Sequence, residues 1–203
     1  MMAVLLFNSR PKTLAMIGLG GGSLAKFCYR YLSDTRIKVV EINPHVISLR
    51  DEFRVPPDDG RFKIRHGDGA DFVRLPPYPV DVLMVDGFDS GGQPAALCSQ
   101  RFYDDCLDAL QANGLMVVNL HAGHPDYATF LARIRRSFGE DVLVVGDHDC
   151  SNTIVFACKG PLLRHFKHAS LRAPARFDAR AWADLMPTFE RVATAWKQHV
   201  EAR

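Results

Sequence analysis

Residues 16–23 read M-I-G-L-G-G-G-S, an apolar run that passes directly into a glycine-rich turn. Residues 38–41 read K-V-V-E, a second apolar run that ends in a carboxylate. An apolar strand, a glycine turn, a helix and a second strand that ends in an acid are typical of a doubly wound α/β domain that holds a nucleoside. Because glycine has no Cβ, the backbone can turn sharply there and approach a ligand closely. The stretch therefore predicts a Rossmann-like α/β fold with a ligand at the glycine turn.

The order of the glycines indicates which kind of nucleoside binds. Gly18, Gly20, Gly21 and Gly22 follow the pattern G-x-G-G-G, whereas a dinucleotide site reads G-x-G-x-x-G. No arginine directly follows Glu41 to hold a ribose phosphate. These features favour a ligand without phosphate, such as S-adenosylmethionine, over a dinucleotide, and we expect Glu41 to accept hydrogen bonds from the two ribose hydroxyls. A glycine turn that serves packing alone is the alternative.

Composition indicates one soluble globular domain. The chain has 203 residues, of which 47% are hydrophobic and 24% charged. It has no apolar run long enough to span a bilayer, and its start lacks the basic residues and length of a signal peptide, so we expect a cytoplasmic protein. A formal charge of +2 is too small to indicate nucleic acid as a partner. The five cysteines show no paired spacing and are expected to be reduced thiols of the core: Cys28, Cys98, Cys106, Cys150 and Cys158.

Strands and helices alternate along the chain. Hydrophobic periodicity predicts strands at 13–17, 38–41, 62–66, 80–86 and 115–120, and helices at 23–32, 44–53, 70–74, 100–110 and 126–138. Gly114 is expected to end the fourth of these helices. Two further strands, 142–145 and 153–158, are separated by too few residues for a parallel crossover and must be antiparallel. Together these elements predict a three-layer α/β domain with a mixed seven-stranded sheet, the class I S-adenosylmethionine methyltransferase-like fold.

The carboxyl-terminal part is expected to complete this domain. We assign residues 1–160 to the nucleoside-binding α/β domain and residues 161–203 to a linker and a helix that packs on it. Five apolar side chains at helical spacing are predicted to pack: Trp182, Leu185, Phe189, Val192 and Trp196. Pro187 should kink or interrupt this helix. A segment without acids is interpreted as a solvated linker, with an anionic partner as the alternative, and carries Lys159, Arg164, His165, Lys167, His168, Arg172 and Arg176.

Acidic residues follow the third and fourth strands. Asp68 could accept a hydrogen bond from an adenine amino group, while Gly69 would let the base lie against the backbone; a helix cap is the alternative role of Asp68. Asp86 and Asp89 stand three positions apart where the fourth strand ends. Ligands of open α/β sheets bind at that edge. We therefore expect both carboxylates to face one cleft, one anchoring the turn or ligand and the other reaching the substrate.

A metal site is the competing interpretation of another loop. His121, His124 and Asp126 follow the fifth strand, and His148 and Asp149 would be in reach if the terminal hairpin folded over. Their spacing matches no established zinc pattern, so we predict no metal.

These motifs, in this order, resemble the spermidine synthase (polyamine aminopropyltransferase) family over residues 13–158. The most specific features are D-x-x-D at 86–89 and the downstream Phe102-Tyr103 pair. The resemblance implies decarboxylated S-adenosylmethionine or S-adenosylmethionine as co-substrate, and a polyamine such as putrescine as acceptor of an aminopropyl group. It implies that Asp89 is the base that takes a proton from the attacking amine. The implied cofactor-binding residues are Gly18, Gly20, Gly21, Gly22, Glu41, Ile42, Asp68, Gly69 and Asp86.

Two departures from the family pattern leave other functions open. The family's glycine loop carries an aspartate, which holds the amino group of the transferable chain, where this sequence has Gly21. Family enzymes also carry an amino-terminal β-rich domain that helps to close the polyamine site and to build a homodimer, whereas the first expected strand here begins at Thr13. The chain is therefore expected to be a trimmed member or one with a changed substrate. The alternatives are an S-adenosylmethionine-dependent methyltransferase and a nonenzymatic nucleoside-binding or scaffold protein.

Overall fold

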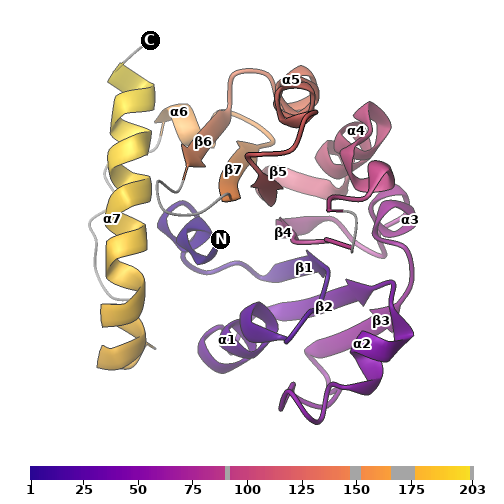
Figure 1. Ribbon diagram of the computed structural model, residues 1–203. Helices are drawn as coiled ribbons and strands as arrows, with labels where there is room; N and C mark the ends of the chain where they lie inside the picture. Colours follow the sequence, from indigo (N-terminus) through magenta and orange to yellow (C-terminus); the bar gives the residue numbers. More distant parts are fainter. Residues whose placement is uncertain (90–91, 147–151, 166–176, 202–203) are drawn as a thin grey trace.

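The computed structural model describes residues 1–89, 92–146, 152–165 and 177–201 (Figure 1). The elements are, in chain order, η1 (Met2–Leu6), β1 (Thr13–Ile17), α1 (Ser23–Tyr31), β2 (Arg36–Glu41), α2 (Pro44–Ser48), β3 (Phe62–His66), α3 (Gly69–Arg74), β4 (Val80–Val85), η2 (Ala95–Cys98), α4 (Gln100–Ala109), β5 (Leu110–His121), α5 (Tyr127–Phe138), β6 (Val142–Gly146), β7 (Asn152–Cys158), α6 (Leu162–His165) and α7 (Ala179–Glu201). Within this part of the chain no helix is both long and apolar enough to cross a membrane.

The strands form the mixed seven-stranded sheet that the sequence predicts. Their order is β3-β2-β1-β4-β5-β7-β6. Neighbours from β3 to β5 are parallel, while β7 is antiparallel to both β5 and β6, which confirms the terminal hairpin. The strand order reverses between β1 and β4. In open α/β sheets ligands bind at the carboxyl ends of the strands beside such a reversal.

Two apolar clusters cover the two faces of this sheet. One cluster joins the side chains on one face to η1, α1 and α7, and the other joins the opposite face to α3, α4 and α5. Strand side chains alternate between the faces, so Leu14 and Met16 enter the first cluster while Ala15 and Ile17 enter the second. The three-layer architecture is therefore confirmed (Figure 1).

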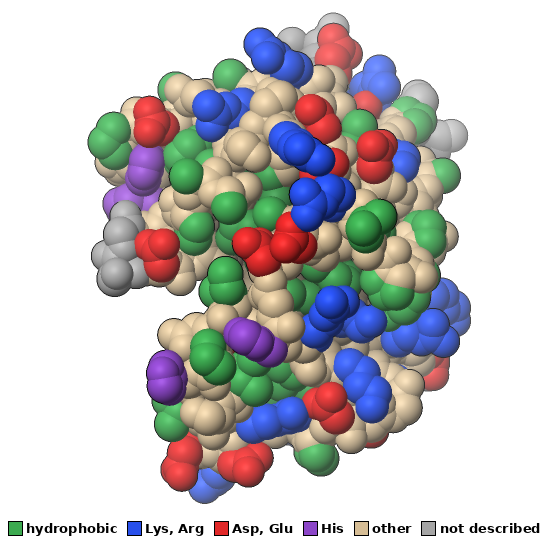
Figure 2. Space-filling model, turned by 90° about the vertical axis from the view of Figure 1, so that its right-hand side faces the viewer, with side chains coloured by type: hydrophobic (Ala, Val, Ile, Leu, Met, Phe, Trp, Pro, Cys, Tyr) green, Lys and Arg blue, Asp and Glu red, His purple; other side chains and the backbone are tan. Residues whose placement is uncertain are grey.

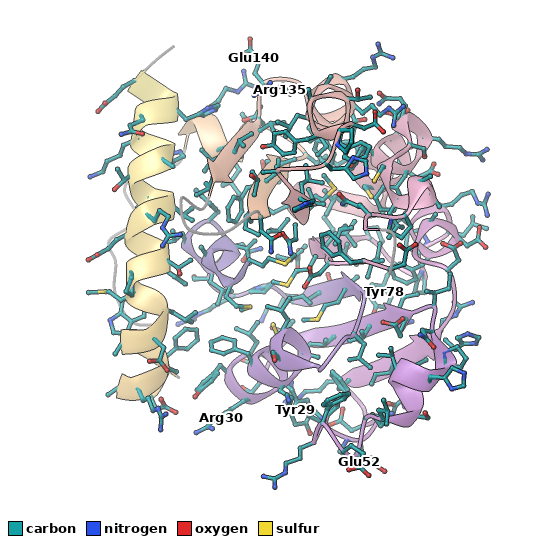
Figure 3. All side chains as sticks on the ribbon, viewed as in Figure 1. Tyr29, Arg30, Glu52, Tyr78, Arg135 and Glu140 are labelled. Carbon is teal, nitrogen blue, oxygen red and sulfur yellow. The ribbon has the colours of Figure 1, made fainter. Side chains whose placement is uncertain are left out.

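Two tyrosines, Tyr29 and Tyr78, contact basic side chains at the β2–β3 edge of the sheet. The Arg61 guanidinium lies 4.0 Å from the ring centroid of Tyr29, whose hydroxyl donates to Asp59 at 2.8 Å. The hydrogen bond to Asp59 raises the pKa of Tyr29. Tyr78, which precedes β4, faces the basic side chains at the start of β2; Figure 3 labels both tyrosines. These contacts support the strand that carries Glu41.

Two element boundaries differ from the predictions. The predicted helix 44–53 ends at Ser48, because the chain then closes into a turn in which the Val55 amide donates to the Arg50 carbonyl at 2.8 Å. Gly114 does not end a helix but lies inside β5, which begins directly after α4. A Cβ on Gly114 would lie 3.0 Å from the Val80 carbonyl oxygen, so the strand needs glycine for this close approach.

The predicted kink or interruption at Pro187 is wrong, because α7 runs through it as one helix (Figure 1). Packing stabilises a helix more than one backbone hydrogen bond does, and α7 buries Phe189, Val192 and Trp196 in the first cluster. The Trp196 indole also donates to the Leu163 carbonyl at 2.7 Å.

The basic segment is only partly described. Lys159 donates to two main-chain carbonyls at the end of α4, and Arg164 pairs with Asp141 at 2.8 Å, so both side chains have structural partners. The rest of this segment lies outside the described residues and carries Lys167, His168, Arg172 and Arg176. The alternative of an anionic partner therefore stays a prediction.

Candidate functional site

Two glycines of the turn after β1 are required by the fold. Gly18 has a φ of 95°, and a Cβ there would lie 2.4 Å from the Asp86 carbonyl oxygen. Gly22 caps α1 in the left-handed conformation, and its Cβ would lie 2.4 Å from the side chain of Val55. Any larger residue at either position would push β1 away from β4 or α1 away from its neighbour.

The other two glycines lie on the open side of the turn. Gly20 has a φ of 49° and no atom within 4 Å of where a Cβ would stand. Gly21 has no left-handed φ, and the atom nearest to its Cβ position is Cδ1 of Phe53 at 4.0 Å. A side chain at Gly21 would therefore meet neither backbone strain nor a clash. The fold leaves space for a ligand, or for an acidic side chain, at this position.

Glu41 ties the glycine turn to the end of β2. The residue is only 7% exposed. Its Oε2 accepts a hydrogen bond from the Leu19 amide at 2.7 Å, and its Oε1 accepts one from the Asn43 amide at 2.8 Å. A carboxylate offers about four lone-pair positions, so each oxygen retains acceptor capacity for a hydroxyl. Ile42, the next residue, is apolar yet 63% exposed, which leaves a bare surface suited to a flat base.

Asp68 and Gly69 have structural roles in this geometry. Oδ1 of Asp68 accepts from the Ala70 amide at 2.7 Å, so the helix-cap alternative describes what this side chain does here. A Cβ on Gly69 would lie 2.4 Å from Cγ2 of Ile17, so packing of α3 against β1 requires glycine. The adenine contact of Asp68 and Gly69 stays a prediction.

Asp86 faces the glycine turn across a small cavity. The cavity has a volume of about 220 Å³ and is lined by Met16, Gly18, Leu19, Gly20, Gly21, Ser23, Leu24, Ala25 and Asp86. Figure 2 shows a notch between an upper and a lower lobe of the surface. Burial lowers the pKa of the Met1 amino group, and the charge of Asp86 opposes this shift.

Asp89 lies in the loop beyond β4 and is exposed. Its amide donates to the Gly92 carbonyl at 2.8 Å, and the Gly92 amide returns a bond at 3.1 Å, which closes the loop. As far as the described residues show, Asp89 does not line the glycine-turn cavity. The structure thus brings Asp86 to the cavity of the glycine turn, and the roles of both Asp86 and Asp89 toward a ligand or substrate stay predictions.

Sequence reasoning missed Asn119, which contacts Asp86, and Gln93, which contacts Asn119. Nδ2 of Asn119 donates to Oδ1 of Asp86 at 2.9 Å. Gln93 is 7% exposed, and its Nε2 donates to the main-chain carbonyl of Asn119 at 3.2 Å. The side-chain oxygens of Gln93 and Asn119 are buried and have no hydrogen-bond partner among the described residues. The sequence signal that could have indicated Asn119 was its lone amide within the apolar run L-M-V-V-N-L at 115–120.

His121 is the last residue of β5, and His124 helps to build the turn that follows it. Nδ1 of His124 accepts from the Asp126 amide at 3.0 Å, and its ring lies 4.9 Å from that of Phe130. His148 and Asp149 lie outside the described residues. In the part of the chain that the structure describes, no three His, Cys, Asp or Glu residues are placed to hold a metal ion.

The cysteines that the structure describes are free, buried thiols, as predicted: Cys28, Cys98, Cys106 and Cys158. Burial raises the pKa of Cys28 to about 12 and those of Cys98 and Cys158 to about 11. The Phe102-Tyr103 pair also lies in the core, and burial raises the pKa of Tyr103. Cys150 lies outside the described residues.

Known proteins are similar to this chain in sequence. The family model for the spermine/spermidine synthase domain matches residues 1–151. The polyamine aminopropyltransferase of Neisseria meningitidis serogroup B is 38% identical over 159 residues, which cover 77% of this chain and 60% of the relative. That of Chromobacterium violaceum is 37% identical over 175 residues, which cover 85% of this chain and 67% of the relative. The chain thus spans about 60% of the length of the Neisseria enzyme.

Solved structures show the same fold. Human methyltransferase-like protein 13 in complex with SAH has a TM-score of 0.71 at 22% identity, covering 96% of this chain and 86% of the other. Spermidine synthase in complex with the transition state analogue AdoDATO has a TM-score of 0.66 at 21% identity, covering 99% of this chain and 73% of the other.

The fold is therefore that of the class I methyltransferase-like proteins. Within that class, the chain belongs to the spermine/spermidine synthase family.

Proposed function

We propose that this chain is an aminopropyltransferase that moves an aminopropyl group from decarboxylated S-adenosylmethionine to a polyamine such as putrescine. The observation that carries the proposal is that Asp86 lines one cavity with the glycine turn, which brings an acid beside the proposed nucleoside site. Family membership and relatives named polyamine aminopropyltransferase support the same reaction.

The proposed nucleoside site uses the turn and the ends of β2 and β3. Glu41 would accept from the ribose hydroxyls, Ile42 would contact the base, and Asp68 would accept from its amino group. The full proposed set is Gly18, Gly20, Gly21, Gly22, Glu41, Ile42, Asp68, Gly69 and Asp86. The exposed Ile42 and the open Gly20 and Gly21 fit such a ligand.

Asp89 would act as the base of the reaction. An alkyl amine with a pKa near that of lysine, about 10.4, is protonated near neutral pH and cannot attack until it loses a proton. Once Asp89 takes that proton, the nitrogen electron pair forms a bond to the carbon next to the sulfonium, and the carbon–sulfur bond breaks with its electrons passing to sulfur. The sulfur leaves as a neutral thioether, methylthioadenosine. Asp86, across the cavity from Gly21, would offset the charge of the aminopropyl ammonium.

Gly21 supports methyl transfer as the second candidate function. The family's aspartate is missing here although the backbone at Gly21 would accept a side chain without strain. Without that acid, the carboxylate of intact S-adenosylmethionine could bind the backbone N–H groups of residues 20–22.

Product analysis by mass spectrometry separates the two functions. The protein and its Gly21→Asp variant are incubated with putrescine and with either S-adenosylmethionine or its decarboxylated form. We expect an aminopropyl adduct with the decarboxylated form, and a stronger preference for it in Gly21→Asp, because a buried cation gains a second counter-charge. An added methyl group, or no product with the decarboxylated form, would overturn the proposal.

A further inference from the structure

Asn119 is a polar side chain at the carboxyl end of an otherwise apolar stretch of β5. Its neighbours Val118 and Leu120 are fully buried. The register of the sheet brings it to the cleft, since Val118 pairs with Val85 and the next residues along the two strands are Asn119 and Asp86. Asn119 therefore stands beside the carboxylate that lines the glycine-turn cavity.

The Asn119 carboxamide has one favourable orientation. With Nδ2 toward Asp86 it donates to a carboxylate oxygen, whereas the flipped amide would bring its own oxygen against that acceptor. The observed orientation leaves Oδ1 of Asn119 buried without a partner among the described residues, which costs free energy. An apolar side chain would avoid that cost, so the amide is explained by the hydrogen bond that it donates. Among the described residues, Asn119 is the side chain that donates to the Asp86 carboxylate, through Oδ1.

The main-chain carbonyl of Asn119 contacts the residue that follows the Asp89 loop. Gln93 directly follows Gly92, the residue that closes the Asp89 loop, and donates to the Asn119 carbonyl. Its own side-chain oxygen is also buried without a partner in the described part of the chain. One residue thus contacts Asp86 through its side chain and the Asp89 loop through its backbone.

We propose that Asn119 is a positioning residue that sets the placement of Asp86 relative to the loop that carries Asp89. This inference rests on the proposed function, in which those two carboxylates serve the aminopropyl group and the attacking amine. Asn119 touches neither substrate in this role. It acts through Asp86 and through Gln93, and it should affect the rate of transfer more than the binding of the nucleoside.

The test compares two isosteric substitutions. Asn119→Asp replaces the donor to Asp86 by an acceptor without changing shape. Gln100→Glu is the matched control, because Nε2 of Gln100 donates to Oδ1 of Asp104 at the same distance, 2.9 Å, where α4 meets α5 and outside the lining of the glycine-turn cavity. Hydrogen bonds to charged groups are strong enough that Asn119→Asp should lower kcat about 10- to 100-fold, while KM for the nucleoside and the activity of Gln100→Glu stay within about twofold of the parent. Equal kcat values for the two variants would overturn the proposal.

A second variant and a second measurement keep the proposal testable if Asn119→Asp fails to fold or if the parent protein shows no aminopropyl transfer. Gln93→Met keeps the length of the side chain but removes its donor, and it should lower kcat while thermal unfolding and methylthioadenosine binding by calorimetry stay near the parent values. The Asn119 side-chain amide signals are also followed by ¹⁵N NMR in parent and Asp86→Asn protein. A shift of these signals in a protein that shows no aminopropyl transfer would refute the proposed function while keeping the contact. Signals that do not move, or a Gln93→Met variant with parental kcat, would refute the positioning role itself.

Discussion

On the β1–β2 side of the cleft, Glu41 and Asp68 accept hydrogen bonds from backbone amides, whereas on the β4–β5 side Asp86 accepts one from the side chain of Asn119. Asp68 and one oxygen of Glu41 accept from amides two residues further along the chain, whereas the other oxygen of Glu41 accepts from Leu19, 22 positions away. An acid held by another side chain depends on the register of a neighbouring strand. The acids of the side proposed to bind the nucleoside are therefore fixed in part by local backbone contacts, whereas the side-chain contact of Asp86 comes from a residue 33 positions away.

The largest expected effect tests the chemistry assigned to the β4–β5 side. Asp89→Asn keeps the shape of the side chain but removes the proton acceptor, so turnover should fall by about 10²–10⁴. Binding of methylthioadenosine should change little, because the nucleoside is assigned to the other side. Steady-state kinetics and calorimetry measure the two quantities, and Glu52→Gln, an exposed carboxylate labelled in Figure 3, is the control. Parental turnover in Asp89→Asn would remove it as the base.

A smaller effect tests the β1–β2 side. Glu41→Ala should weaken methylthioadenosine binding about ten- to several-hundredfold, because hydrogen bonds to a charged group contribute about 1.5–3 kcal/mol each. The variant also frees the Leu19 amide, so its unfolding temperature should fall too. Glu41→Gln keeps one acceptor oxygen and is expected to bind with intermediate affinity. If folded Glu41→Ala binds as tightly as the parent, Glu41 holds only the turn and no ribose.

The two sides also differ in how far the sequence predicts them. The strands, the glycine turn and the positions of Glu41 and Asp86 follow from local patterns, since apolar periodicity and glycine order need only neighbouring residues. Gly69 and Asp68 show the limit of this reasoning, because close packing on Ile17 and the cap of α3 also explain them. A local motif therefore predicts where a residue lies more securely than what it binds.

Asn119 and Gln93 could not be predicted in this way. Val80 pairs with Leu110 and Val82 with Leu115, so two steps along β4 correspond to five along β5. This irregularity, with Asn113 at a φ of 61° and Gly114 against Val80, decides which residue of β5 stands beside Asp86. Counting from the predicted start of the strand does not reveal it. Contacts between side chains of two such strands can be identified only once the pairing of the strands is known.

The smallest expected effect compares thiols on the two faces of the sheet. Cys28 lies in the cluster beneath the glycine turn, and Cys98 lies in η2, after the Asp89 loop. Burial raises the pKa of Cys28 to about 12 and that of Cys98 to about 11, so at pH 8 the thiolate fraction of Cys98 should be the larger of the two. Alkylation by iodoacetamide, followed by peptide mapping, should therefore modify Cys98 before Cys28.

The same shifts set the sign of a pH effect on stability. A thiol whose pKa is raised in the folded state contributes stability that is complete below its ordinary pKa of 9.0, and this stability is lost as pH rises toward 11–12. Urea unfolding at pH 8 and pH 10 should show the decrease, and a Cys28→Ala variant should show less of it than the parent.

In the alkylation experiment, faster modification of Cys28 than of Cys98 would contradict the comparison of the two faces. It would mean that the core around Cys28 opens more readily than the segment after the Asp89 loop.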